Sequence, residues 1–228
     1  MPGDIEKLKK LFDGRFQNHA LLKEALTHRS YSVENKLKYD NQRLEFLGDA
    51  VLEIIHTEHL FHLYPELPEG DLTKIRSALA CESMLAMLAR KLNLGSFLLI
   101  GKGELGAGGN DRDSTLADLF EAVLGAVYLE AGFEFARNFV LDLFKKYCPD
   151  PKEQLISLNP KGRLQEISQH RWGCVPTYKL FRQSGLQHLP VFEVELRVAH
   201  LVAVGSGGSR KLAEISAAKT MCYYLKKH

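Results

Sequence analysis

Residues 44–55 read LEFLGDAVLEII, an apolar run interrupted by Glu45, Asp49 and Glu53. On a helix, at about 100° per residue, these three acids fall in one line and the remaining circumference is almost entirely apolar. Such a helix is expected to be mostly buried. A carboxylate on a buried helix is costly unless it pairs with a cation or binds a metal, so the run predicts a cation site.

A second run, residues 116–130, repeats this pattern. Its helical wheel is apolar nearly all round, except for a wedge that holds Asp118 and Glu121 with Gly125 between them. The first run also has an interior glycine, Gly48. Glycine inside a helix costs about 1 kcal/mol relative to alanine, so a glycine beside each wedge predicts a close approach of backbones or of a ligand. We therefore expect the two acidic wedges to face each other.

The two acidic pairs predict an all-oxygen metal site. Glu45 and Asp49 are four residues apart and therefore share one helical face. Asp118 and Glu121, three residues apart, do the same. Four carboxylates suit hard cations such as Mg²⁺ or Mn²⁺, which lower the pKa of a bound water and stabilise charge during phosphodiester hydrolysis. For a single pair, solvated or ion-paired acids would be the preferred interpretation, but two pairs on two apolar helices favour a metal site.

Two other metal patterns on the first helix are weaker. The pair Glu53-x-x-His56 forms half of a di-iron motif, and the sequence has no second copy of it. His56, His59 and His62 could bind zinc, but we interpret them as exposed or half-buried helix residues.

The segment 101–109, GKGELGAGG, contains the G-x-G-x-x-G pattern of dinucleotide-binding loops. Such loops belong to folds in which strands and helices alternate, and that alternation is absent here. We therefore interpret the segment as a loop made mobile by its glycines, and we predict no nucleotide cofactor.

The charge of the chain is unevenly distributed. Residues 1–150 have 18 Lys and Arg against 23 Asp and Glu, a net charge of −5, and residues 151–228 have 12 against 5, a net charge of +7. The basic part is expected to attract a polyanion, and the acidic part can bind divalent ions. This combination suggests an enzyme that acts on nucleic acid.

The N-terminus does not resemble a signal peptide, and no window approaches the length of a membrane span. We expect a cytoplasmic protein without a membrane partner. The four cysteines are widely spaced and lack zinc-ligand neighbours, so we interpret them as reduced, mostly core thiols.

Periodicity predicts an all-α first domain, residues 1–150, and an α+β second domain, residues 159–228, joined by a linker at 151–158. The helices expected in the first domain cover residues 4–12, 19–27, 41–64, 71–79, 83–92, 116–130 and 133–147. The second domain reads as α-β-β-β-α, with helices at 161–170 and 209–226 and strands at 177–181, 191–198 and 201–205.

The stretch 41–52, NQRLEFLGDAVL, resembles the signature of the ribonuclease III family, and 116–122, LADLFEA, resembles that family's second acidic motif. Residues 164–166, LQE, and 205–214, GSGGSRKLAE, resemble a double-stranded RNA-binding domain. The resemblance covers nearly the whole chain, in the bacterial order of domains. It implies Mg²⁺-dependent cleavage of double-stranded RNA, 5′-phosphate and 3′-hydroxyl ends with short 3′ overhangs, and a role in rRNA and mRNA processing.

The resemblance also assigns residues to the site. The positions that match the family's metal ligands are Glu45, Asp49, Asp118 and Glu121, with Asp49 and Glu121 as the catalytic pair. Phe46 matches an aromatic residue that enters a socket in the partner subunit, which implies a homodimer. Glu69 matches an accessory acid, whereas Gln42 departs from the glutamate that is usual at its position.

The basic domain offers its own RNA-binding candidates. Gln165 and Gln169 are one helical turn apart, so both amides can reach the minor groove of A-form RNA. His188, between the first two strands, matches a residue that reaches the next minor groove. Arg210 and Lys211 stand at the positive start of the last helix, where they can contact phosphates. Alternatively, these residues are ordinary solvated side chains. The net charge of +7 on residues 151–228 makes this alternative less favoured.

Two functions fit these features: an endoribonuclease, or a non-catalytic binder of duplex RNA with a degenerate nuclease domain. A degenerate domain is expected to have lost at least one of the four acids. All four are present, which favours the enzyme.

Overall fold

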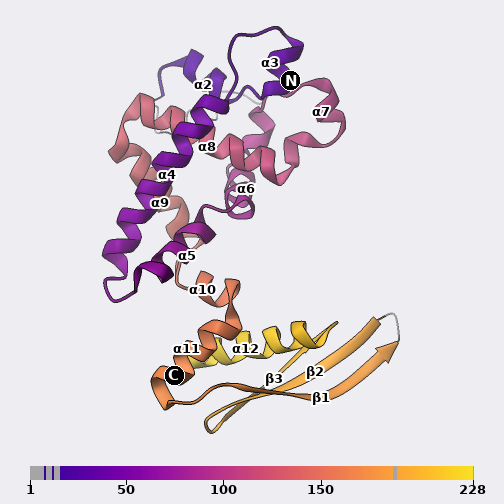
Figure 1. The fold of residues 1–228 in the computed structure, drawn as a ribbon. Helices are drawn as coiled ribbons and strands as arrows, with labels where there is room; N and C mark the ends of the chain where they lie inside the picture. Colours follow the sequence, from indigo (N-terminus) through magenta and orange to yellow (C-terminus); the bar gives the residue numbers. More distant parts are fainter. Residues whose placement is uncertain (1–7, 9–11, 13–15, 187–188, 228) are drawn as a thin grey trace. The chain divides into compact units, whose positions relative to one another are not determined.

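The computed structural model describes residues 8, 12, 16–186 and 189–227 of the chain (Figure 1). The chain forms two compact units, Met1–Pro151 and Lys152–His228, which are described separately. The helix expected over residues 4–12 lies almost wholly outside the described residues. No helix among those described is long and apolar enough to cross a bilayer.

The regular elements of the first unit are all helices among its described residues, as the periodicity predicted, apart from one isolated β-bridge between Thr27 and Leu99. Its α-helices are α2 (His19–Ala25), α3 (Arg29–Glu34), α4 (Gln42–Leu63), α5 (Glu69–Leu79), α6 (Glu82–Lys91), α7 (Lys102–Gly106), α8 (Asp113–Ala131) and α9 (Phe133–Tyr147). Two short 3₁₀ helices, η1 (Leu94–Phe97) and η2 (Gly109–Asp111), precede α8. Helix α4 ends one residue before Tyr64-Pro65, where the proline disfavours a further helical residue.

Helix α8 lies at the centre of the first unit and packs against α4, α6, α9 and α2 (Figure 1). Contact on every side explains why its wheel is apolar nearly all round. Its buried residues are Thr115, Leu116, Ala117, Leu119, Phe120, Ala122, Val123, Leu124, Gly125, Ala126 and Val127.

The backbones of α4 and α8 touch at the two interior glycines. A Cβ atom on Gly48 would clash with the backbone carbonyl of Glu121. A Cβ atom on Gly125 would clash with the carbonyl of Leu44 and lie 3.1 Å from the Gly48 amide nitrogen. The predicted close approach is therefore confirmed, and it brings the acidic wedge of each helix to the same crossing.

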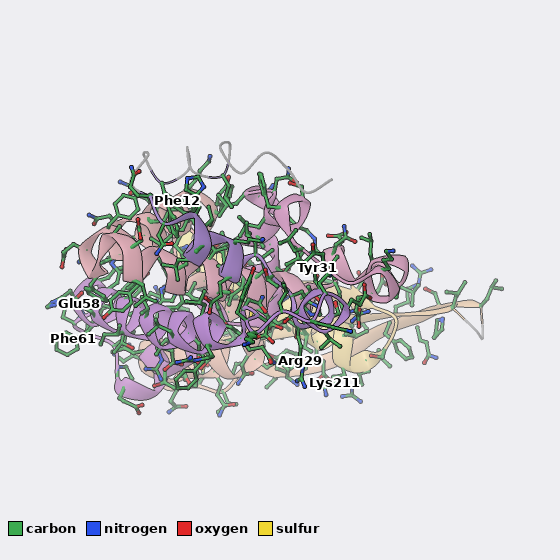
Figure 2. All side chains as sticks on the ribbon, turned by 90° about the horizontal axis from the view of Figure 1, so that it is seen from above. Phe12, Arg29, Tyr31, Glu58, Phe61 and Lys211 are labelled. Atoms are coloured by element: carbon green, nitrogen blue, oxygen red, sulfur yellow. The ribbon has the colours of Figure 1, made fainter. Side chains whose placement is uncertain are left out.

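The outward face of α4 differs from the prediction. We expected the helix to be mostly buried, but Phe46, Ile54 and Phe61 are 80%, 52% and 64% exposed. Figure 2 shows the Phe61 side chain pointing away from the helices. The helical wheel identifies apolar residues but does not show which face has a neighbour, and α8 covers only one face of α4.

The histidines of α4 also differ in part. His59 is half-buried and His62 exposed, as expected, but His56 is buried. Neither ring nitrogen of His56 has a hydrogen-bond partner among the described residues, and its ring packs edge-on against Phe144 with 4.4 Å between centroids. Burial, assisted by the nearby His59, lowers the pKa of His56 to about 3. His56 is therefore a neutral core side chain.

The glycine-rich segment is ordered into α7 and η2, so its interpretation as a mobile loop was wrong. The Gly101 amide donates to Ser30 Oγ at 2.9 Å, and the Lys102 amide donates to Glu34 Oε2 at 3.0 Å. These bonds attach the start of α7 to α3. A side-chain carboxylate thus occupies the helix N-terminus that a dinucleotide phosphate would need.

The second unit has the predicted α-β-β-β-α order. Its elements are α10 (Glu153–Leu158), α11 (Pro160–Trp172), β1 (Thr177–Leu186), β2 (Leu189–Val198), β3 (Leu201–Gly207) and α12 (Arg210–Lys227). The three strands form one antiparallel sheet in the order β1-β2-β3. Strand β1 is longer than predicted because the register shifts between Leu180 and Arg182, which interrupts the alternation of the sequence.

Helix α12 covers one face of this sheet and packs against β2, β3 and α11, and Gly205 of β3 allows α12 to lie close. A Cβ atom at Gly205 would clash with the backbone of Ala213 and Ala217. The core beneath consists of Ile156, Leu164, Leu196, Val198, Ala217, Ala218, Met221, Cys222 and Leu225.

Residues 151–158, expected to form a linker, contain helix α10. Ile156 is buried in the core of the second unit, and Glu153 Oε1 forms an ion pair of 2.8 Å with Lys226 Nζ. Most of the expected linker is therefore part of the second unit.

We predict that Gly48→Ala and Gly125→Ala each lower the free energy of unfolding by about 2–4 kcal/mol, because an added methyl must push α4 and α8 apart. Urea denaturation measures this. Gly70→Ala is the matched control, because Gly70 lies in α5 and a Cβ atom there would meet no other atom within 4 Å. Equal stability of Gly48→Ala and wild type would contradict the close crossing.

Candidate metal centre and nucleic-acid interface

Three carboxylates meet beside the crossing of α4 and α8. Glu45 comes from α4, and Asp118 and Glu121 come from α8. One oxygen of each lies within 4.8 Å of the others, and all three side chains are half-buried. Their placement follows from the helix contact, because Gly48 rests on the backbone of Glu121 itself.

These carboxylates repel one another. Burial, then the charges of Asp49, Glu45 and Asp118, raises the pKa of Glu121 to about 8. Burial is also the largest cause of the raised pKa of Glu45, followed by Asp118, Asp40 and Asp49. Asp118 has a raised pKa through burial, which nearby His28 partly offsets.

No described Lys or Arg forms an ion pair with any of the three carboxylates. Half-buried acids without a cationic partner fit a divalent cation, and their oxygen donors suit a hard one. A bound ion would supply Lewis-acid chemistry, lowering the pKa of water and stabilising charge on phosphate oxygens.

Asp49 stands apart from the group of three. It is exposed, one turn after Glu45, and its oxygens are not within the 4.8 Å group, yet its charge still raises the pKa values of Glu45 and Glu121. The structure thus brings together three of the four predicted ligands, and the role of Asp49 stays a prediction.

Two other predicted positions lie outside the carboxylate group. Glu69 is exposed at the start of α5 and accepts a hydrogen bond from Thr73 Oγ1 at 2.8 Å. Gln42 is exposed at the start of α4, and its backbone amide donates to Asp40 Oδ1 at 3.2 Å. The accessory role of Glu69 remains a prediction, and Gln42 is the position at which the chain departs from the usual glutamate.

A pocket of about 480 Å³ adjoins the carboxylates. Its lining residues are His28, Arg29, Ser30, Val33, Glu34, Asn41, Gln42, Glu45 and Asp118. Backbone hydrogen bonds assemble it: Leu99 O accepts from the His28 amide at 2.9 Å, and Thr27 O accepts from the Asn41 amide at 2.9 Å. Helical periodicity gave no sign of His28, and the polar run His28-Arg29-Ser30 between apolar segments is the only signal in the sequence.

In the second unit, Gln165 and Gln169 are both exposed on α11, one turn apart, as the prediction required. Arg210 and Lys211 are exposed at the start of α12, where Ser209 Oγ accepts from the Leu212 amide at 3.2 Å. Figure 2 labels Lys211. His188 lies outside the described residues.

Glu214 joins a cation of α11 to a cation of α12. Its carboxylate accepts from Lys161 Nζ at 2.7 Å and from Arg210 Nε at 3.1 Å. These bonds lower the pKa of Glu214, with the bond to Lys161 as the largest cause. The network links Lys161, at the start of α11, to Arg210, at the start of α12.

Family models match both units of the chain. A family model described as ribonuclease-III-like matches residues 18–147, and a double-stranded RNA binding motif matches residues 160–225. The chain is 46% identical over 217 residues to "Ribonuclease 3" of Natranaerobius thermophilus, with 94% of each chain covered.

The chain belongs to the ribonuclease III family. It is also 42% identical to "Ribonuclease 3" of Campylobacter jejuni, with 95% of each chain covered. A solved nuclease domain of that organism's enzyme superposes with a TM-score of 0.61 at 46% identity, covering 64% of this chain and all of that one. The resemblance seen in the sequence motifs is thereby confirmed.

Membership of the ribonuclease III family identifies the chain as an endoribonuclease that acts on double-stranded RNA. The family also implies dependence on a divalent metal, which agrees with the acidic cluster. The second unit is the part that binds double-stranded RNA.

We predict that Glu121→Gln raises the melting temperature of the metal-free ribonuclease III chain at pH 8.5 by about a few degrees. Because the pKa of Glu121 is raised from 4.5 to about 8, the folded state holds a proton that the unfolded state has lost between these pH values. Wild-type stability from this group therefore falls as pH rises through that window. Glutamine cannot ionise, so the difference in melting temperature between Glu121→Gln and wild type should shrink towards pH 5.

Thermal unfolding with EDTA at both pH values measures this difference. Glu53→Gln is the control, because Glu53 is exposed on the same helix and outside the carboxylate group. A Glu121→Gln variant that melts below wild type at pH 8.5 would contradict the repulsion.

We predict that Lys211→Gln weakens binding to duplex RNA and reduces the slope of log affinity against log salt by about one, as expected for loss of one phosphate contact. Fluorescence anisotropy across a salt series, without a divalent metal, measures the slope. Lys226→Gln, at the other end of α12, is the control and should leave it unchanged. Equal slopes for Lys211→Gln and Lys226→Gln would show that Lys211 does not contact an RNA phosphate.

Proposed function

We propose that the chain cleaves double-stranded RNA with Mg²⁺, with Mn²⁺ able to substitute, and leaves 5′-phosphate and 3′-hydroxyl ends with short 3′ overhangs. The observation that carries the proposal is the group of Glu45, Asp118 and Glu121, which offers oxygen ligands without a cationic side-chain partner among the described residues. Mg²⁺ prefers carboxylate and water oxygens and retains part of its hydration shell. Ribosomal and messenger RNA precursors are the proposed substrates.

In this proposal Asp49 is the fourth ligand. It lies one helical turn from Glu45, and its charge already acts on Glu121. A bound cation would reverse the sign of the local field, so that the exposed Asp49 carboxylate would be attracted to the group. Asp49 and Glu121 would form the catalytic pair, with Glu69 as an accessory acid.

We further propose a homodimer that forms through the outward face of α4. Phe46, Ile54 and Phe61 expose a line of apolar surface along this helix, and such surfaces are typical of subunit contacts. The solved Campylobacter jejuni nuclease domain is described as flexible in a region involved in dimer formation of that protein. A dimer would supply two sites for one duplex, one for each strand.

We predict that purified wild-type chain cuts a long RNA duplex when Mg²⁺ is added, and that Glu121→Gln reduces cutting to background while its affinity for duplex RNA stays within about twofold. Glutamine removes a ligand charge but keeps the size of the side chain. Gel analysis of labelled duplex and anisotropy measure cleavage and binding separately. Glu53→Gln should cut like wild type.

The same assay tests the alternative, a non-catalytic duplex binder. Binding without cleavage by the wild-type chain, with an active control enzyme in parallel, would establish that alternative. Unchanged cleavage by Glu121→Gln would instead show that the metal site lies elsewhere.

A further inference from the structure

His28 is held in one tautomer by its own helix. The Ser30 backbone amide donates to His28 Nδ1 at 3.2 Å, so Nδ1 must be unprotonated and accept this bond. The Ser30 hydroxyl lies 2.8 Å from the same nitrogen. Ser30 Oγ also accepts from the Gly101 amide at 2.9 Å, which fixes the position of this oxygen beside Nδ1. The ring proton of neutral His28 therefore resides on Nε2.

The Nε2–H group of His28 has no acceptor among the described residues and is not one of their buried unpartnered atoms. It is thus an accessible donor. His28 lines the pocket that Glu45 and Asp118 also line. A fixed donor consequently stands beside the proposed metal ligands.

We propose that His28 Nε2–H donates a hydrogen bond to a non-bridging phosphate oxygen of the RNA strand being cut, and that Ser30 orients the ring for this contact. The inference rests on the proposed function, because it assigns a substrate contact to the same site. The carboxylates of Glu45 and Asp118 line this pocket, and their negative charge would repel the RNA backbone. A neutral ring with a directed N–H offers phosphate a partner there without competing for the carboxylates as a cation would.

The capping role of His28 must be separated from the proposed contact. His28 is the N-cap of α3 through Nδ1, so its replacement can affect folding as well as RNA. Two substitutions distinguish the roles. Asparagine is a good N-cap whose Oδ1 takes the place of Nδ1, but it does not reach the position of Nε2. Glutamine reaches that position with an amide N–H, but caps poorly.

The experiment compares single-turnover cleavage of an RNA duplex by the wild-type, His28→Asn and His28→Gln chains at saturating Mg²⁺, with melting temperatures recorded for each. We expect His28→Asn to cut about tenfold to a hundredfold more slowly while melting like wild type, as for loss of one hydrogen bond to a charged group. His28→Gln should retain most of the rate despite a lower melting temperature. Wild-type rate in His28→Asn, or rates that follow melting temperature in both variants, would overturn the proposal.

Duplexes with one neutral methylphosphonate linkage, placed in turn at each position near the cut, locate the contact. At the contacted phosphate the linkage should slow wild type but slow His28→Asn no further, because both changes remove one interaction. If the rate loss from the linkage and the rate loss from His28→Asn multiply at every position, the proposed contact is overturned. A wild-type chain that does not cut any duplex would refute the proposed function itself, whereas the outcomes above refute only the role of His28.

Discussion

The contact of α4 with α8 is the constraint on which the site depends. Gly48 and Gly125 let the two backbones touch, and no other residue fits at either position without displacement of a helix. Because carboxylate oxygens of Glu45, Asp118 and Glu121 must come within 4.8 Å of one another, the helices that support them must be this close. The same crossing that packs the core therefore sets the geometry of the proposed metal centre.

The crossing also creates an electrostatic conflict. Burial and mutual repulsion raise the pKa of Glu121 to about 8, so the metal-free site favours protonation of an acid that would have to ionise in order to bind the proposed metal. A site of this kind opposes folding in the absence of a cation and is stabilised when one binds. A loss of folding stability is expected at such a site, because the close carboxylates that suit a cation repel one another without it.

In the second unit, by contrast, a carboxylate is paired with cationic side chains. Glu214 accepts from Lys161 and Arg210, so a single carboxylate holds two cations in fixed positions. The ordered cations and the exposed Gln165 and Gln169 lie on helices supported by one small core. Recognition of duplex RNA by shape and phosphate fits such a rigid surface.

Much was determined by the sequence alone. Periodicity identified the all-α part and the α+β part, interior glycines predicted the helix crossing, and motif spacing predicted four acids, three of which meet there. These features are local, since each depends on residues within a few helical turns of one another.

Only the tertiary structure decided which faces have neighbours. It left Phe46 exposed on α4, buried His56 without a hydrogen-bond partner among the described residues, and drew α10 into the second core. It also brought His28 to the carboxylates through backbone bonds to residues distant in the chain, such as Leu99. A sequence pattern states what a side chain could contact, whereas burial and long-range pairing depend on every other element of the fold.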